Sequence, residues 1–148
     1  MSQSYLLDTN MVSYIVSGAS ASARAHLLRL DGKSGIYVSA ISEADLRFGM
    51  AKGQKHSTRI AMMERFLMKA TVLPWGHEAA VAYGGLRARL ETAGTPLGAL
   101  DSLIASHALA IDAVLVTHDK AFHRLNKAGL ERALQIADWA TDLPAWVI

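Results

Sequence analysis

The chain contains no cysteine, so it has neither a disulfide framework nor a thiolate metal site. It also has no run of about 18 apolar residues, which argues against a membrane-spanning helix. At the N-terminus no basic region precedes an apolar one, and Asp8 interrupts the first apolar stretch. We therefore expect no secretion signal and a cytoplasmic protein.

Several catalytic signatures are missing as well. There is no glycine-rich phosphate loop of the Rossmann or Walker type, and no serine lies in a nucleophile-elbow pattern. The histidines are not paired at zinc-ligand spacing, which argues against a zinc site. Hydrophobic residues make up 51% of the chain and charged residues 19%, as expected of a folded protein. The formal charge of +2 is compatible with a nucleic-acid ligand but does not identify one.

Short apolar runs alternate with helical patterns along the whole chain. The runs predict strands at residues 5–7, 36–39, 71–73 and 113–117, and a final edge strand at 134–136. Such alternation predicts parallel strands joined by right-handed helical crossovers. The chain has 148 residues with no repeat or linker. We therefore expect one domain over residues 1–148, a three-layer α/β/α fold around a mostly parallel sheet of four to five strands.

Four acidic residues lie near the ends of the predicted strands. Asp8 and Asp119 each follow a strand, Asp45 lies in the helix after the second strand, and Asp101 lies in the first turn of a helix at 99–111. The carboxyl ends of parallel strands share one edge of the sheet, where ligands usually bind. Carboxylates gathered in a partly buried crevice repel one another, and a hard cation such as Mg²⁺ or Mn²⁺ removes that conflict.

Each acid also has a structural explanation. Asp8 and Asp119 are residue types that cap helix N-termini. Asp45 follows Ser42 by three residues, and Ser42 is the expected N-cap of a helix that ends at Gly53, so the two resemble a capping box. Asp101 in a first turn is favoured by the helix dipole. The joint placement of all four at one edge, more than any single residue, points to a metal site.

Four segments resemble, in family order, the motifs of the PIN domain, and in particular the VapC-type toxins of bacterial type II toxin–antitoxin pairs. They are LLDTN at 6–10, VSAISEADLRFG at 38–49, PLGALDSLIASHA at 96–108 and LVTHDKAF at 115–122. The resemblance implies a PIN-like fold and an endoribonuclease that depends on Mg²⁺, with Mn²⁺ as an alternative. It also implies an RNA substrate of the tRNA or rRNA class, a cognate antitoxin and a homodimer.

The resemblance assigns metal-binding positions to Asp8, Asp101 and Asp119. The family usually has glutamate at the remaining acidic position, where this chain has Asp45. Glu43 is a weaker candidate, because it lies about 200° around the helix from Asp45. We expect all four aspartates to act in catalysis, with His118 having no ligand role. The sequence leaves open whether one or two ions bind.

Two other functions are compatible with parts of the pattern. The first is a non-catalytic RNA- or protein-binding module of the same fold, but all four acidic positions are kept here. The second is a Mg²⁺-dependent phosphatase with Asp8 as nucleophile. That chemistry commonly needs a second acid two residues later, where this chain has Asn10.

Overall fold

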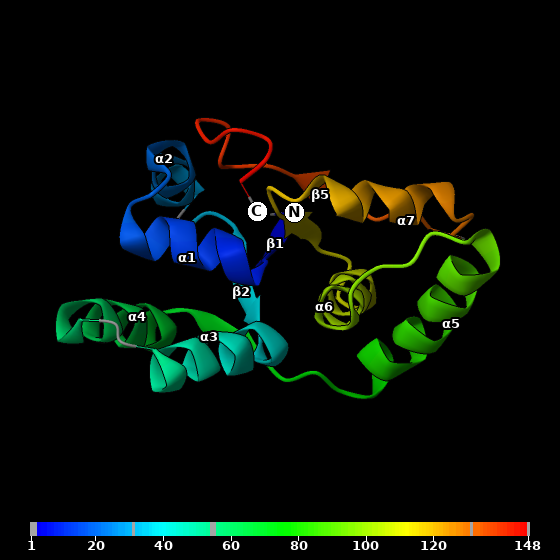
Figure 1. Ribbon diagram of the computed structural model, residues 1–148, viewed down its shortest axis with the longest axis horizontal. Helices are drawn as coiled ribbons and strands as arrows, with labels where there is room; N and C mark the ends of the chain where they lie inside the picture. Colours follow the sequence, from blue (N-terminus) through cyan, green and yellow to red (C-terminus); the bar gives the residue numbers. More distant parts are fainter. Residues whose placement is uncertain (1–2, 31, 54–55, 131, 148) are drawn as a thin grey trace.

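A five-stranded parallel sheet lies at the centre of the computed structural model, which describes residues 3–30, 32–53, 56–130 and 132–147 (Figure 1). Its order is β3-β2-β1-β4-β5. The strands are β1 (Ser4–Leu7), β2 (Gly35–Ser39), β3 (Thr71–Leu73), β4 (Val114–Val116) and β5 (Ile136–Ala137). In the central strand Leu6 pairs with Tyr37 of β2 and with Leu115 of β4. This confirms the predicted parallel sheet, with β5 as its edge strand.

Helices cover both faces of the sheet (Figure 1). They are α1 (Thr9–Ser17), α2 (Ala21–Leu30), α3 (Ala40–Lys52), α4 (Ser57–Lys69), α5 (His77–Ala93), α6 (Ala99–Ala110), the 3₁₀ helix η1 (Lys120–His123) and α7 (Arg124–Lys127). Successive strand residues point to opposite faces, so Leu7 packs in one core and Leu6 in the other. The predicted three-layer α/β/α architecture is confirmed.

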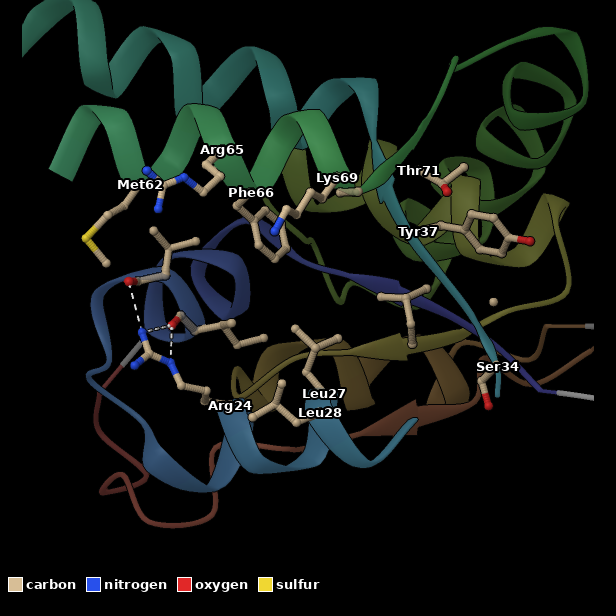
Figure 2. Close-up of a pocket in the computed structure, with 15 residues that line it drawn as sticks. Arg24, Leu27, Leu28, Ser34, Tyr37, Met62, Arg65, Phe66, Lys69 and Thr71 are labelled. Atoms are coloured by element: carbon tan, nitrogen blue, oxygen red, sulfur yellow. Dashed lines mark hydrogen bonds between the residues drawn. The ribbon is translucent and has the colours of Figure 1, made fainter. Parts of the chain in front are cut away.

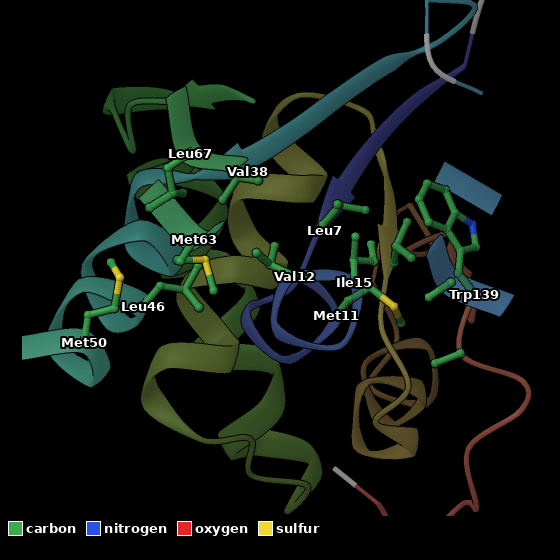
Figure 3. Close-up of a cluster of buried hydrophobic side chains, with 13 residues drawn as sticks. Leu7, Met11, Val12, Ile15, Val38, Leu46, Met50, Met63, Leu67 and Trp139 are labelled. Atoms are coloured by element: carbon green, nitrogen blue, oxygen red, sulfur yellow. The ribbon is translucent and has the colours of Figure 1, made fainter. Parts of the chain in front are cut away.

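The core that contains Leu7 lies beneath α1, α2, α3 and α4 (Figure 3). Met11, Val12 and Ile15 of α1 meet Leu46 of α3 there, together with Met63 and Leu67 of α4. The core that contains Leu6 is built from the apolar sides of α5, α6, η1 and α7. The residues that face each core follow the helical spacing of their helix.

The start of α3 differs from the prediction. Ser39, not Ser42, is its N-cap, and the Ile41 amide donates to the Ser39 hydroxyl at 3.1 Å. Ser42 lies inside the helix, fully buried. The capping-box interpretation of Ser42 and Asp45 is therefore wrong. The strand determines this outcome, because the pairing of β2 with β3 ends at Ser39 opposite Leu73, and the helix begins at the next residue.

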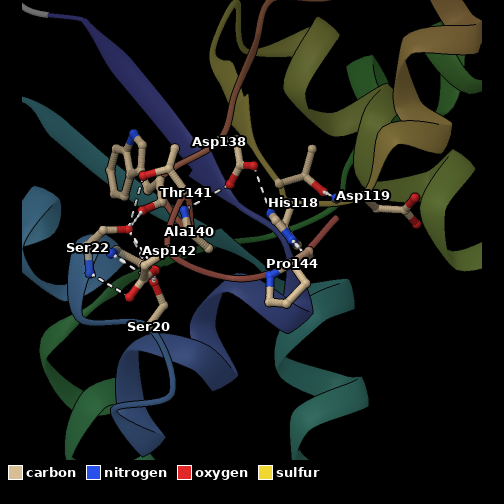
Figure 4. A network of polar contacts seen from close by, with 12 residues as sticks. Ser20, Ser22, His118, Asp119, Asp138, Ala140, Thr141, Asp142 and Pro144 are labelled. Carbon is tan, nitrogen blue, oxygen red and sulfur yellow. Dashed lines mark hydrogen bonds and ion pairs between the residues drawn. The ribbon is translucent and has the colours of Figure 1, made fainter. Parts of the chain in front are cut away.

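The C-terminal segment after β5 is tied to the rest of the fold. Asp142 accepts hydrogen bonds from the hydroxyls of Ser20 and Ser22 and from two backbone amides in the first turn of α2 (Figure 4). Trp139 is buried and stacks on the His26 ring at a centroid distance of 4.6 Å. None of the helices that the structure describes combines the length and apolarity needed to cross a bilayer.

Candidate metal centre at the carboxyl edge of the sheet

Asp8 lies between the central strand and α1, at the carboxyl edge. Its backbone amide donates to the Val116 carbonyl of β4 at 3.0 Å, which carries the parallel pairing one residue past β1. Its Oδ1 accepts from the Met11 amide at 2.8 Å, so Asp8 is the N-cap of α1. The side chain is only 6% exposed. The capping explanation is thus correct for Asp8, and the carboxylate has the Thr117 hydroxyl as a second hydrogen-bond partner.

Asp119 has the same arrangement at the end of β4. Its Oδ1 accepts from the Ala121 amide at 2.9 Å and caps η1. Its own amide donates to the Thr117 hydroxyl at 3.0 Å, and the same hydroxyl hydrogen-bonds the Asp8 carboxylate. Thr117 is 2% exposed and therefore links the two acids from within the core. Sequence reasoning missed Thr117; the available signal was a hydroxyl at the end of an apolar strand, directly before the acid.

The other acids come from helices α3 and α6, which contact each other near this edge. Asp101 lies in the first turn of α6 and Asp45 in the second turn of α3, and both are partly buried. Glu43 instead pairs with Arg47 at 3.0 Å, and Arg47 also binds Glu64 at 2.9 Å. Because the Glu43 carboxylate is already paired with Arg47, the geometry favours Asp45 over Glu43 as the α3 acid of the candidate metal centre.

Electrostatics couple the four aspartates. Burial raises the pKa of Asp8 to about 6, hydrogen bonds from Thr117 and the Met11 amide oppose the rise, and the charges of Asp101 and Asp119 add to it. Burial also raises the pKa of Asp101, and the charges of Asp119 and Asp45 raise it further. Asp8, Asp101 and Asp119 thus act on one another, and Asp45 acts on Asp101. Like charges held together in this way are stabilised by a cation.

The donor set fits a hard divalent ion. The four side chains offer only carboxylate oxygens, the ligands that Mg²⁺ and Mn²⁺ prefer. In the part of the chain that the structure describes, none of the four forms an ion pair with a basic side chain. In the same described ranges, no three acidic or histidine side chains are already arranged as a metal-binding group. The acids therefore do not form a finished ligand shell, and their ligand roles stay a prediction.

His118 contacts the C-terminal segment. Its Nδ1 hydrogen-bonds Asp138 at 2.7 Å, and its Nε2 donates to the Pro144 carbonyl at 2.7 Å (Figure 4). The Pro144 carbonyl raises the pKa of His118, burial opposes this, and Asp138 raises it further. With a carbonyl and a carboxylate as partners, both ring nitrogens have acceptors, an arrangement that favours the protonated ring. It holds the C-terminal segment beside Asp119.

An apolar groove opens on the other side of α1, between α2, α4 and β2 (Figure 2). Its volume is about 560 Å³. Leu27, Leu28, Met62 and Phe66 line it, and α4 adds basic side chains at its rim. Leu28 is 69% exposed and Met62 is 37% exposed, which is unusual for side chains of this size. The groove is thus a surface at which another apolar segment can be buried.

Residues 5–128 match the PIN domain family. A ribonuclease VapC2 of Rickettsia felis is 34% identical over 128 residues, which are 86% of this chain and 96% of that protein. A tRNA(fMet)-specific endonuclease VapC of Shigella flexneri is 29% identical over 137 residues, covering 92% of this chain and 98% of that protein. The crystal structure of VapBC2 from Rickettsia felis bound to a promoter DNA fragment superposes with a TM-score of 0.81 at 31% identity, covering 91% of this chain and 98% of that chain.

The fold, the carboxylate edge and this match show that the chain belongs to the PIN domain family. Within the family, its identity to the Rickettsia felis protein over nearly all of that protein's length places it among the VapC ribonucleases. The family resemblance drawn from the four sequence motifs is confirmed.

Proposed function

We propose that the chain is a Mg²⁺-dependent endoribonuclease that acts as the toxin of a toxin–antitoxin pair. The observation that carries the proposal is a buried Asp8 whose charge is opposed by Asp101 and Asp119 and matched by no basic partner among the described residues. A nuclease site of this composition is explained by a cation that completes it. A structural role alone would not require charged groups to be gathered where each disfavours the others.

Asp8 and Asp101 are the proposed principal ligands, with Asp45 and Asp119 completing or orienting the shell. A bound Mg²⁺ or Mn²⁺ would lower the pKa of a coordinated water and stabilise the charge that develops on an RNA phosphodiester. Asp8 and Asp119 each have one oxygen fixed by a helix-capping amide, which directs the remaining oxygen. The Thr117 hydroxyl connects the Asp8 carboxylate to the backbone amide of Asp119. The protein's part is therefore to orient oxygen ligands around a site in which Asp8 is buried and the other three acids are partly exposed.

The proposed substrate is a structured RNA of the tRNA or rRNA class, which places the activity in the cytoplasm. The Shigella flexneri relative is named for its action on tRNA(fMet), and the Rickettsia felis relative is named a ribonuclease. The phosphodiester backbone suits a hard cation, so the carboxylate edge and this substrate class agree.

The proposed partner is a cognate antitoxin, bound in the groove lined by Leu27, Leu28, Met62 and Phe66. Related solved structures from Rickettsia felis and Salmonella typhimurium are VapBC complexes. An amphipathic segment with an apolar face would bury these side chains, and acidic residues beside that face would meet Arg65 and Lys69. A homodimer is part of the same proposal, and light scattering of the purified chain gives its mass.

The test uses purified protein, labelled tRNA and rRNA fragments, and either Mg²⁺ or EDTA. Cleavage in Mg²⁺ that stops in EDTA is expected. Asp101→Asn should lower the rate at least about 100-fold while the circular dichroism spectrum is kept, because a ligand oxygen is replaced by an amide. Glu43→Gln is the matched control and should keep wild-type activity. RNA that is bound but never cut would instead establish a non-catalytic module, and hydrolysis of only a small phosphomonoester would establish a phosphatase.

A further inference from the structure

Tyr14 of α1 lies beside the carboxylate edge with its hydroxyl unused. The side chain meets the His118 ring edge-on, with ring centroids 6.5 Å apart and planes at 87°. Its hydroxyl oxygen is buried, and it has no hydrogen-bond partner among the residues that the structure describes. Buried hydroxyls nearly always have a partner. An unpaired phenol next to a candidate metal centre therefore needs an explanation.

The groups around the hydroxyl are carboxylates. Burial raises the pKa of Tyr14, and the charges of Asp8, Asp119 and Asp138 raise it further, so all three acids lie near the ring. Asp138 is already occupied, because one oxygen accepts from His118 and the other from the Ala140 amide. Asp8 also has two partners, the Met11 amide and the Thr117 hydroxyl.

Asp119 is the exception. Its Oδ1 caps η1 through the Ala121 amide, and its Oδ2 has no hydrogen-bond donor in the described ranges 3–30, 32–53, 56–130 and 132–147. Tyr14 thus has an unpaired donor, and Asp119, whose charge acts on the Tyr14 phenol, has an oxygen without a donor. His118 precedes Asp119 in the chain and contacts the Tyr14 ring, so the backbone of Asp119 lies near Tyr14 independently of charge.

We propose that Tyr14 is a positioning residue of the metal centre, whose hydroxyl donates a hydrogen bond to the Asp119 carboxylate when the site is loaded. This inference depends on the proposed metal-dependent function. Outer hydrogen bonds fix the orientation of ligand carboxylates and contribute strongly to metal affinity. Tyr14 is a neutral donor, so it supports a carboxylate without competing with the ion for charge.

The experiment measures Mn²⁺ affinity by isothermal titration calorimetry, without RNA, for the wild type and for Tyr14→Phe. Loss of the outer hydrogen bond should weaken Mn²⁺ binding by about tenfold or more. The melting temperature without metal should stay the same or rise, because the hydroxyl has no partner in that state. Tyr83→Phe is the matched control: Tyr83 lies on α5, where its hydroxyl accepts from Arg87, and its removal should leave Mn²⁺ binding unchanged.

A double-mutant cycle shows whether the effect passes through Asp119. Asp119→Asn keeps an oxygen for the Ala121 amide and replaces the other with a group that cannot accept. Tyr14→Phe should therefore cause no further loss in that background. Affinity for Mn²⁺ within twofold of wild type in Tyr14→Phe, or a lowered metal-free melting temperature, would overturn the assignment alone. A wild-type chain that binds no Mn²⁺ would overturn the proposed metal dependence as well.

Discussion

Replacing Asp8 by asparagine should stabilise the metal-free protein at neutral pH. Burial raises the pKa of Asp8 from 3.8 to about 6. The folded state therefore holds this proton more tightly than the unfolded state, and stability falls as the pH rises from about 4 to about 6. Above about pH 6 the folded protein carries the full free-energy cost of a buried, ionised Asp8 carboxylate. At about 1.4 kcal/mol for each pH unit, it amounts to about 3 kcal/mol.

Asparagine removes the charge and keeps the local structure. Its amide oxygen accepts from the Met11 amide as the carboxylate does, since asparagine is as good an N-cap as aspartate. The amide nitrogen can donate to the Thr117 hydroxyl, which has a second lone pair. We expect Asp8→Asn to be more stable than the wild type by about 1–3 kcal/mol at pH 8, and by at most about 0.5 kcal/mol at pH 4.

Urea unfolding followed by circular dichroism, in EDTA and from pH 4 to pH 8, measures this difference. Asp112→Asn is the control, because Asp112 is exposed and a change there should give no such pH dependence. With Mg²⁺ at about 100 times its dissociation constant the wild type alone should gain about 2.7 kcal/mol. A variant that is less stable than the wild type at pH 8 in EDTA, or a difference that does not change with pH, would refute the reasoning.

Three other substitutions test the surroundings of the site. Trp139→Ala should cost about 3–5 kcal/mol in urea unfolding, because it empties a buried, stacked position, whereas the exposed Trp146→Ala should cost almost nothing. Hydrogen bonds from serine hydroxyls lower the pKa of Asp142 to about 2. Asp142→Ala should therefore lower the melting temperature at pH 7. This difference between variant and wild type should disappear as the pH falls from about 4 to 2, because Asp142 then becomes protonated. Leu28→Glu should weaken antitoxin binding at least about tenfold in a pull-down titration with an unchanged melting temperature, because Leu28 is exposed in the groove.

Most of the fold followed from periodicity. The apolar runs located all five strands to within two residues, and the alternation with helices predicted that the strands are parallel. The order β3-β2-β1-β4-β5 did not follow from the pattern, because it depends on pairings between segments far apart in the chain. The helical segment after the Asp119 cap is divided into η1 and α7, because its first turn has 3₁₀ geometry.

The error at α3 shows the limit of local signals. Ser39 and Ser42 are both good N-caps, and the sequence around them does not choose between them. The sheet makes the choice, because β2 pairs as far as Ser39 and no strand residue follows it. Ser42 is then enclosed by the helix, with a hydroxyl that finds no partner among the described residues.

The sequence predicted the positions of Asp8 and Asp119 in the candidate site because of the topology of a parallel sheet. Acids that directly follow parallel strands must reach the same edge, which brought Asp8 and Asp119 into one hypothesis. Thr117 and Tyr14 were not visible in this way, because their importance comes from contacts that only the folded chain creates. The His118–Asp138 contact likewise spans twenty residues.

Capping and metal binding are not competing roles for these aspartates. A carboxylate has two oxygens, and in Asp8 and Asp119 one of them is held by a helix amide, which fixes the direction of the other. The frequency with which aspartate caps helices therefore does not argue against a ligand role. Asp45 and Asp101 have no such anchor among the described hydrogen bonds, although both are partly buried. If an ion binds as proposed, it must order these two side chains itself, so the largest rearrangement on metal binding should lie where α3 meets α6, while the strand ends stay as they are.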